Sequence, residues 1–381
     1  MTERERALEL LRRIERDSLY ATITLLRESG VVRTIVLGVL RWRSRLDHAI
    51  ETFAERKIGR LDPLVVDVLR VGIYQLHFMD VAAYAAVSES VDAAPKRARG
   101  FVNAILRRAT RGLPDPPDVA TKFAHPKWMF DRWSRMYGEA RAVAIMESNQ
   151  QLSYPDVLAL NGAPPSPAVP STLVPDVYKL AGSSSQLDRA DFYPMDEGSA
   201  VIAHIASLRG HTDVLDMAAA PGGKTLYMRH RGAAVVSADI SITRLHPLIG
   251  RQSRLVVADG RQPPFRKRFP IVLLDAPCSA TGTIRKNPEI KWRLGESDLA
   301  PFAALQRELL VSAATIADAV VYSTCSLEAE ENDAVVAGFE RDDVTPYVPE
   351  GARKWVENGV LRLTPDSGAD GFTAFLLRGS R

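Results

Sequence analysis

Cysteine is scarce in this chain, whose 381 residues include only two, Cys278 and Cys325. Two cysteines cannot form a disulfide framework, and no cluster of cysteine and histidine has the spacing of a metal site. The sequence therefore predicts free thiols in a reducing compartment and no bound metal. No apolar run approaches the ~20 residues of a membrane span, and the charged N-terminus lacks the apolar core of a secretion signal. These absences predict a cytoplasmic protein that does not enter a membrane.

The composition is that of a globular protein whose charge is unevenly distributed. Hydrophobic residues make up 46% and charged residues 25% of the chain, and 381 residues are too many for one ordinary core and suit two domains. Residues 1–140 contain 24 Lys and Arg against 18 Asp and Glu, whereas the remainder contains 25 against 28. A basic first part joined to a near-neutral second part indicates a polyanionic substrate; dispersed, solvated arginines are the alternative.

The first 120 residues carry helical patterns with no strand pattern between them. Thr2 and Glu5 form a capping box before an apolar repeat of three-and-four spacing, and Asp62-Pro63 is a second helix start. The sequence predicts an all-α domain over residues 1–120 and a connector with short β-like pieces over residues 121–195. The basic residues of the first domain would form a phosphate-binding patch if several share a face; they are Arg41, Arg43, Arg45, Lys96, Arg97, Arg99, Arg107, Arg108 and Arg111.

From residue 196 onward, strand and helix patterns alternate, which is typical of a doubly wound parallel sheet. Helices are predicted over residues 199–208 and 301–317. The predicted strands cover residues 214–217, 233–239, 255–259, 271–275 and 320–323. The sequence thus predicts an α/β catalytic domain of the Rossmann-like, doubly wound type over residues 196–381, preceded by the all-α domain.

The first predicted strand leads into a loop of small residues that suits a nucleoside cofactor. The loop consists of Ala218, Ala219, Ala220, Pro221, Gly222, Gly223 and Lys224. The phosphate-binding loop of an NTPase needs glycine where Ala218 stands, and the G-x-G-x-x-G loop of NAD-binding proteins is absent. The next two strands end in acids, Asp239 and Asp259, of which the first would bind ribose hydroxyls and the second the adenine edge. A cofactor with ribose and adenine but no phosphate fits, so the sequence predicts S-adenosyl-L-methionine.

Each cysteine follows a predicted buried strand. Cys278 comes three residues after Asp275, which ends the strand over residues 271–275, and Cys325 closes the apolar run that begins at residue 319. In open α/β sheets, ligands bind at the carboxyl ends of the strands. Two thiols at two such ends favour nucleophilic chemistry; the alternative is two small buried hydrophobic residues.

Several motifs, in this order, resemble those of the Sun-type RNA cytosine-5 methyltransferases. The motifs cover residues 196–200, 215–225, 238–241, 257–260, 274–282, 285–292, 323–326 and 370–374. The helical N-terminus, with residues 101–108 and 125–128, is similar to the NusB-like extension of the RsmB-type branch, which methylates small-subunit ribosomal RNA. The resemblance covers nearly the whole chain. It departs at Ala218, where the family often has cysteine, and at Thr373, where it usually has phenylalanine.

This resemblance implies a reaction and a role for each site residue. The reaction would be methylation of carbon 5 of a cytosine in RNA, with 16S ribosomal RNA as the expected substrate and S-adenosyl-L-methionine as cofactor. The all-α domain and the segment over residues 121–195 would contact the RNA, and we expect a monomer. Cys325 would attack the base, Cys278 would assist release of the methylated RNA, and Asp275 would contact the amidine edge of cytosine and face the cofactor. Lys224 would either anchor its loop or act beside the reacting centre.

Three alternatives to this reaction stay open. The chain could methylate transfer RNA at the same cytosine atom. It could be a phosphate-loop NTPase, or a non-catalytic RNA-binding factor of ribosome assembly.

Overall fold

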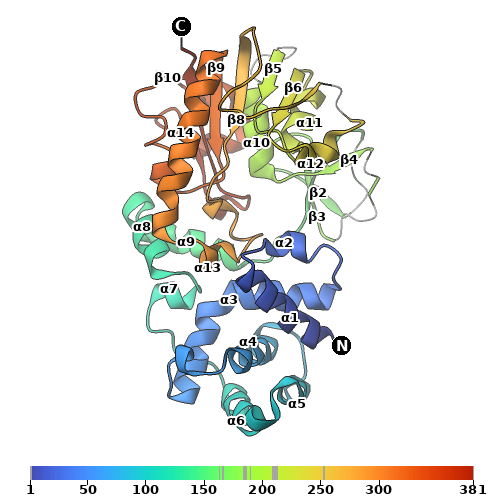
Figure 1. Ribbon diagram of the computed structural model, residues 1–381, viewed down its shortest axis with the longest axis vertical. Helices are drawn as coiled ribbons and strands as arrows, with labels where there is room; N and C mark the ends of the chain where they lie inside the picture. The colour runs from blue at the N-terminus through green and yellow to red at the C-terminus, as the bar shows by residue number, and fades with distance from the viewer. Residues whose placement is uncertain are drawn as a thin grey trace. The chain divides into compact units, whose positions relative to one another are not determined.

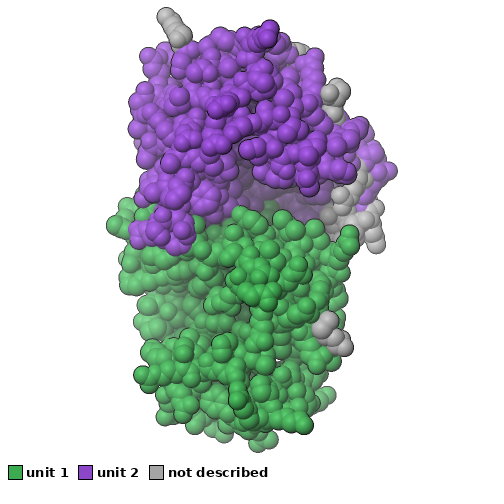
Figure 2. All heavy atoms as spheres, viewed as in Figure 1, with its two compact units in different colours: residues 1–151, 284–294 green, residues 152–283, 295–381 purple. Residues whose placement is uncertain are grey.

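The computed structural model describes residues 2–380 apart from a few short stretches (Figure 1). The stretches outside the described residues are 163, 165–166, 183–186, 189, 208–212 and 252–253. The chain divides into two compact units (Figure 2). Unit 1 comprises residues 1–151 and 284–294, and unit 2 comprises residues 152–283 and 295–381. The domain boundaries expected at residues 120 and 195 are not the boundaries of these units and stay predictions.

Unit 1 is helical. Both predicted helix starts are confirmed, because Thr2 Oγ1 accepts a hydrogen bond from Glu5 N at 3.2 Å and Asp62 accepts one from Leu64 N at 2.9 Å, directly before Pro63. The α-helices of the described residues of unit 1 are α1 (Glu3–Arg16), α2 (Ala21–Thr24), α3 (Gly30–Ala54), α4 (Pro63–Phe78), α5 (Ala83–Ala93), α6 (Arg99–Ala109), α7 (Val119–Lys122), α8 (Lys127–Tyr137), α9 (Glu139–Gln150) and α13 (Ile290–Arg293).

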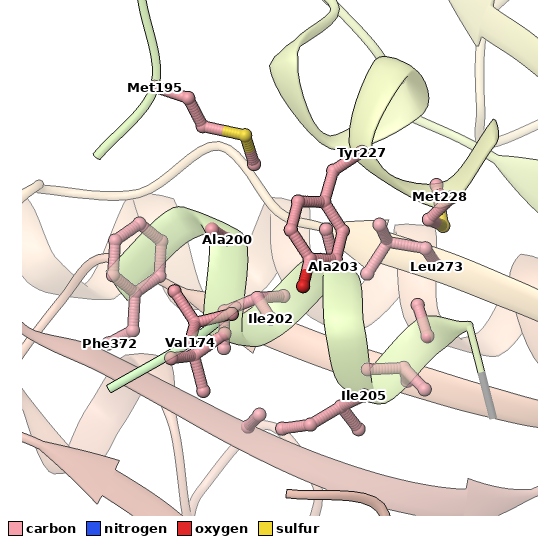
Figure 3. Close-up of a cluster of buried hydrophobic side chains, with 14 of the residues drawn as sticks. Val174, Met195, Ala200, Ile202, Ala203, Ile205, Tyr227, Met228, Leu273 and Phe372 are labelled. Atoms are coloured by element: carbon pink, nitrogen blue, oxygen red, sulfur yellow. The ribbon is translucent and has the colours of Figure 1, made fainter. Parts of the chain in front are cut away.

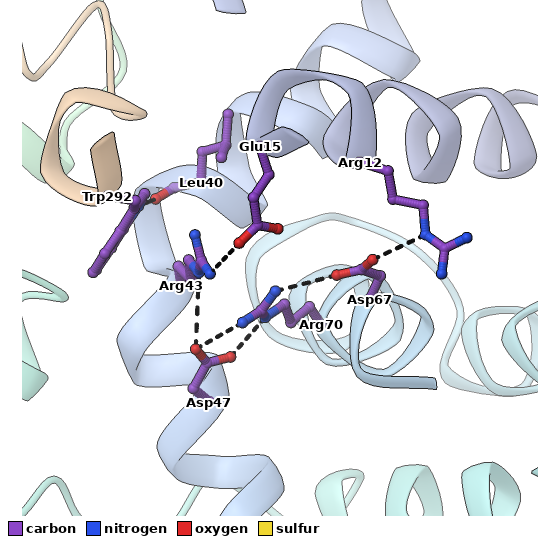
Figure 4. A network of polar contacts seen from close by, with 8 residues as sticks. All are labelled: Arg12, Glu15, Leu40, Arg43, Asp47, Asp67, Arg70 and Trp292. Atoms are coloured by element: carbon purple, nitrogen blue, oxygen red, sulfur yellow. Dashed lines mark hydrogen bonds and ion pairs between the residues drawn. The ribbon is translucent and has the colours of Figure 1, made fainter. Parts of the chain in front are cut away.

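Buried charges join three of these helices beside the apolar core of unit 1 (Figure 4). Arg70 on α4 pairs with Asp47 on α3 at 2.7 Å and with Asp67 at 3.1 Å. Asp67 also accepts a hydrogen bond from Arg12 on α1 at 3.3 Å. Arg70 and Asp67 are both buried. Removing one partner would leave a buried charge without compensation, so these pairs fix how α1, α3 and α4 pack.

Residues 284–294 lie in unit 1 although their neighbours in the chain on both sides belong to unit 2. The buried Lys291 ammonium donates to the carbonyl oxygens of Arg41 and Ala124, both at 2.7 Å. Trp292 Nε1 donates to Leu40 O at 2.6 Å. Burial lowers the pKa of Lys291 well below its ordinary value, and the charge of Arg41 adds to this effect. The segment is therefore held by specific hydrogen bonds to the helices around it.

The predicted basic patch is only partly available on the surface of unit 1. Arg41 is buried, and its Nη2 donates to Arg285 O at 2.9 Å, so the expectation that it joins a surface patch is wrong. Arg43 pairs with Glu15 at 2.6 Å. The basic residues of the predicted patch that are exposed are Lys96, Arg97, Arg107, Arg108 and Arg111.

Unit 2 contains two sheets. In the described residues, the larger sheet has nine strands in the order β11-β12-β13-β9-β8-β5-β6-β7, with β10 paired to β13. Its parallel strands are β5 (Asp213–Asp216), β6 (Ala234–Asp239), β7 (Leu255–Val257), β8 (Phe269–Asp275) and β9 (Ala317–Thr324). Its antiparallel strands are β10 (Arg341–Asp342), β11 (Val356–Glu357), β12 (Val360–Leu363) and β13 (Phe372–Arg378). The five predicted parallel strands are confirmed, but the sheet is mixed rather than all parallel.

The smaller sheet of unit 2 is antiparallel, in the order β2-β3-β1-β4. Its strands are β1 (Asp156–Ala159), β2 (Ala168–Pro170), β3 (Val177–Leu180) and β4 (Phe192–Pro194). This sheet falls within the connector for which short β-like pieces were expected.

Helices cover the larger sheet. They are α10 (Glu197–Ala206), α11 (Gly223–His230), α12 (Ile242–Leu245) and α14 (Leu299–Thr315). Ile202 and Ile205 on α10 pack in one apolar cluster with Tyr227 on α11 and Leu273 on β8 (Figure 3). α10 begins two residues before its predicted start, and the predicted end at residue 208 lies outside the described residues. This packing fixes α10 and α11 against the strands whose carboxyl ends carry the predicted site residues.

Candidate functional site

Five parallel strands place the predicted site residues. β9, β8, β5, β6 and β7 are consecutive in the sheet, and each has at least one of these residues at its carboxyl end or in the loop that follows it. Because parallel strands end at the same edge of the sheet, the loops after them come together there. Asp275, the last residue of β8, pairs in register with Ser323 of β9.

The loop after β5 is a tight backbone turn into α11. Gly222 has a φ of +114°, and a Cβ at this position would overlap the side chain of Leu248, so glycine is required here. Ala219 N donates to Ala238 O at 2.9 Å, and Ala220 N donates to the Asp239 carboxylate at 3.3 Å. The loop over residues 218–222 is thus fixed to the end of β6, and its small side chains leave the backbone open to a ligand.

The two strand-end acids have different surroundings. Asp239 is only 2% exposed and accepts a hydrogen bond from Ser241 N at 3.0 Å, with Arg244 Nη1 at 3.8 Å. Asp259 is more open and pairs with Arg261 at 2.6 Å; the hydrogen bonds from Arg261 lower the pKa of Asp259. The structure therefore ties Asp239 to the loop after β5, whereas the Asp259 carboxylate accepts hydrogen bonds from Arg261.

Lys224 and Asp275 form an ion pair of 2.7 Å between their Nζ and Oδ2 atoms. Lys224 Nζ also donates to Ser199 Oγ at 2.7 Å and lies 5.1 Å from the centroid of the Phe372 ring. The other oxygen of Asp275 accepts from Ser323 Oγ at 2.9 Å. Burial opposes the charge of Lys224, but the Asp275 carboxylate outweighs it and raises the pKa of Lys224. Lys224 therefore keeps its charge at neutral pH and holds the Asp275 carboxylate in a fixed orientation.

The two cysteine sulfurs are 3.2 Å apart, and both thiols are free. Cys278 and Cys325 are each partly exposed. The contact with the Cys325 sulfur, followed by burial, raises the pKa of Cys278 well above its ordinary value. The Cys278 thiol thus keeps its proton at neutral pH and can donate it to Cys325 Sγ. Two thiols that are 47 residues apart in the chain are therefore in direct contact.

Two glycines bring a third segment to the cysteine loops. Gly282 N donates to Cys325 O at 2.9 Å, and Gly371 N donates to Gly282 O at 2.8 Å. A Cβ on Gly282 would meet the carbonyl oxygens of Gly371 and Cys325, so no larger residue fits between them. The motif over residues 370–374 thus lies against both cysteine loops.

Sequence reasoning missed two buried acids. Asp216, at the end of β5, accepts a hydrogen bond from Thr225 Oγ1 at 2.6 Å, and burial raises the pKa of Asp216 to about 7. Glu331 is fully buried and accepts a hydrogen bond from Ser279 N at 2.8 Å. No local signal marks Glu331, because the acidic run over residues 328–332 reads as a solvated turn.

The residues of the loop after β5 fit the predicted cofactor. A nucleoside needs a close backbone approach, which the small residues and Gly222 allow, and a carboxylate for its ribose, which Asp239 at the adjoining strand end is placed to supply. In the described part of the chain, no group of three or more His, Cys, Asp or Glu is placed to hold a metal ion. None of its helices has both the length and the apolarity needed to span a bilayer.

A Rossmann-like sheet whose first parallel strand leads into a nucleoside loop without a phosphate-binding motif fits a methyltransferase that uses S-adenosyl-L-methionine. The chain belongs to the RsmB/F family of 16S rRNA methyltransferases. The model of that family matches residues 203–377, and the model of the NusB family matches residues 1–111. These matches confirm the predicted fold class, with its NusB-like all-α domain, and the predicted cofactor. They also establish methylation of ribosomal RNA as the activity of the family to which the chain belongs.

Individual relatives extend over nearly the whole chain. "Ribosomal RNA small subunit methyltransferase B" of Xylella fastidiosa is 32% identical, with 92% of each protein covered. The crystal structure of PH0851 has a TM-score of 0.73 at 23% identity and covers 99% of this chain and 98% of that one. NSun6 from Pyrococcus horikoshii, solved with SFG, has a TM-score of 0.54 at 18% identity and covers 67% of this chain and 98% of that one. The two structures support the fold.

Proposed function

We propose that this protein methylates carbon 5 of a cytosine in small-subunit ribosomal RNA through a covalent bond between Cys325 and the base. The observation that carries the proposal is the pair of sulfurs 3.2 Å apart, at the ends of two adjoining parallel strands. The Lys224–Asp275 ion pair lies at the end of one of these strands. A methyl transfer to an oxygen or an exocyclic nitrogen would need no thiol, and two thiols in contact are therefore the feature that favours carbon 5.

The chemistry of cytosine explains why a thiol is needed. Carbon 5 is too weak a nucleophile to take a methyl group directly. A thiolate that adds to carbon 6 shifts the electron pair of the double bond onto carbon 5, which then attacks as an enamine does and forms the new bond to the methyl group, while the bond from that methyl group to its sulfonium donor breaks. Loss of the carbon-5 proton to a base re-forms the double bond, and the bond between sulfur and carbon 6 breaks with the thiolate as leaving group. Cysteine suits both steps because its thiolate is a good nucleophile and also leaves readily.

Each site residue has a proposed role in this reaction. Cys325 supplies the attacking sulfur, and Cys278 assists release of the methylated RNA. Asp275, held by Lys224 and Ser323, binds the amidine edge of the cytosine and faces the cofactor. Lys224 anchors its loop and keeps the Asp275 carboxylate in place. The target base must leave its stack to reach these groups, so the RNA is unpaired or flipped at that nucleotide.

The cofactor residues in this proposal are those of the sequence prediction. The loop formed by residues 218–224 approaches the nucleoside, Asp239 takes the ribose hydroxyls, and Asp259 lies toward the adenine. When bound, S-adenosyl-L-methionine supplies an electrophilic methyl group.

The helical N-terminal domain and the segment over residues 121–195 have a proposed role in RNA binding. Deletion of the whole helical domain would not test this role cleanly, because Arg41 and Leu40 hold the segment over residues 284–294. Exposed basic side chains on this domain offer a better test, since they contact phosphates without shaping the fold.

Neutralising three of these side chains should weaken RNA binding and its salt dependence. We expect the triple variant Lys96→Gln, Arg107→Gln and Arg111→Gln to lower the slope of log K against log salt by about 2, at about 0.7 per phosphate contact of single-stranded RNA. Fluorescence anisotropy with a ribosomal RNA fragment at several salt concentrations measures the slope. A control triple, in which Arg33, Arg56 and Arg60 of the same unit are neutralised, removes the same charge from exposed positions. Equal slopes for the two triples would show that net charge, and not this surface, matters.

Bisulfite sequencing of small-subunit ribosomal RNA from cells with and without the protein tests the proposed function. We expect one or more cytosines to resist conversion only when the protein is present. Resistance confined to transfer RNA would instead make transfer RNA the substrate. If cells without the protein assemble ribosomes poorly but neither RNA contains a protected cytosine when the protein is present, a non-catalytic assembly factor would be favoured.

A further inference from the structure

A single buried carboxylate joins the two cysteine loops. Glu331 lies on the short turn η6 (Ala329–Glu331) that follows β9, and its side chain is completely buried. Its oxygens accept hydrogen bonds from Ser279 N at 2.8 Å, from Ser279 Oγ and from Ser326 Oγ. Ser279 directly follows Cys278, and Ser326 directly follows Cys325. One side chain thus holds the residue after each cysteine.

The same carboxylate is fixed from behind. Gln306 Nε2 on α14 donates to Glu331 Oε1 and to Pro277 O, each at 2.9 Å. Tyr322 OH on β9 donates to the backbone carbonyl oxygen of Glu331 at 2.6 Å. Within the described residues, the groups that donate hydrogen bonds to the Glu331 carboxylate are all neutral. A buried carboxylate without a cationic partner carries a large desolvation cost, so a position used only for packing would be better served by an uncharged side chain.

We propose that Glu331 is a positioning residue that sets the separation of the Cys278 and Cys325 sulfurs. This role rests on the proposed function, in which Cys325 attacks and Cys278 assists release. The hydrogen bonds to Ser279 fix the loop after β8, the hydrogen bond to Ser326 fixes the loop after β9, and neither loop can shift without breaking one of them. With the carboxylate absent, Cys278 loses its place beside the bond that must break, and release of the RNA slows more than attack.

The electrostatics agree with this geometry. The pKa of Cys278 is raised first by its contact with Cys325, then by burial, and the charge of Glu331 adds to both. Among the described residues, the side chain of Asn332, the next residue, forms hydrogen bonds only with the end of β9 and the loop after it. Its Nδ2 donates to Ser326 O and Glu328 O, both at 2.9 Å. Glu331 thus links the two cysteine loops, whereas its neighbour Asn332 supports only one of them. Variants at these two positions therefore distinguish the two roles.

The test compares covalent RNA adducts in variants that keep both cysteines. Glu331→Gln preserves size but replaces the carboxylate by an amide, which cannot accept from all of its present donors. We expect turnover about 10- to 100-fold lower, the scale of a displacement of about 1 Å in an active site, with unchanged cofactor affinity. We also expect an adduct that survives denaturing gels, which the wild type does not accumulate. Asn332→Ala should slow turnover without accumulating the adduct.

Two further arms keep each outcome informative. Ser279→Ala retains the Glu331 charge and removes one link to the Cys278 loop, so it should accumulate adduct even if Glu331→Gln does not fold. Cys278→Ser is the positive control for trapped RNA. Adduct with Cys278→Ser, but none with a folded Glu331→Gln or with Ser279→Ala, would overturn the positioning role alone. No adduct in any of the variants would overturn the proposed function and the positioning role with it.

Discussion

Replacing Cys325 by serine should abolish methyl transfer. A serine hydroxyl is almost entirely protonated at neutral pH and is a much weaker nucleophile than a thiolate, so carbon 6 of cytosine is not attacked. We expect a loss of at least about 10⁴-fold in turnover, the scale seen when a covalent nucleophile is removed. Transfer of labelled methyl groups to small-subunit ribosomal RNA measures the loss. Cofactor affinity should be unchanged, because the loop that we propose to bind the nucleoside follows β5 and not β9.

The partner cysteine gives a different expected result. Cys278→Ser leaves Cys325 able to attack but slows release, so RNA should stay attached to Cys325 and survive a denaturing gel when cofactor is present. The double variant with Cys325→Ser should show no adduct. If both thiols were only small buried side chains, each serine variant would lower stability a little and neither would hold RNA. An adduct with Cys325→Ser and none with Cys278→Ser would reverse the assignment.

Replacing Asp239 by alanine should weaken cofactor binding by about 1–3 kcal/mol, which corresponds to about 5- to 150-fold in Kd. The carboxylate is 2% exposed and already accepts hydrogen bonds from Ala220 N and Ser241 N. Its loss therefore frees the loop as well as removing an acceptor for the ribose. Isothermal titration calorimetry with S-adenosyl-L-methionine measures the change.

A control for Asp239 is Asp213, which lies at the opposite, amino-terminal ends of the parallel strands. Asp213 begins β5, is 44% exposed in its side chain and lies 3.7 Å from Arg254 and Lys267. Asp213→Ala removes the same charge and should leave the Kd unchanged. An Asp239→Ala variant with wild-type affinity would remove Asp239 from the cofactor site. Tight binding of ATP together with no binding of S-adenosyl-L-methionine would favour a nucleotide-binding loop instead.

Local signals in the sequence were sufficient for much of the fold. The capping box at Thr2 and the proline after Asp62 are short-range features, and the helices begin where these residues place them. The parallel strands of unit 2 were also predicted, because a strand buried on both faces reads as an unbroken apolar run. The acids and cysteines at their ends then indicated where a site would form.

The features that could not be predicted from the sequence depend on contacts between residues far apart in the chain. The antiparallel strand β13 begins within the motif over residues 370–374, and its pairing with β9 is visible only in three dimensions. Arg41 reads as a surface arginine, yet it is buried by a segment more than 240 residues further along the chain. Glu331 lies in an acidic run that resembles a solvated turn, and its contact with Ser279 spans 52 residues. In each case, the partner that decides the role of the residue is distant in sequence.

Release of tritium from carbon 5 of cytosine tests the central claim most directly. Small-subunit ribosomal RNA is transcribed with [5-³H]CTP and incubated with the protein and S-adenosyl-L-methionine. Both the tritium released into water and the methyl groups incorporated into RNA are counted. Because a new methyl group at carbon 5 displaces the proton there, the account predicts about one tritium released for each methyl group incorporated. Methyl incorporation without tritium release would place the methyl group on another atom and contradict the account.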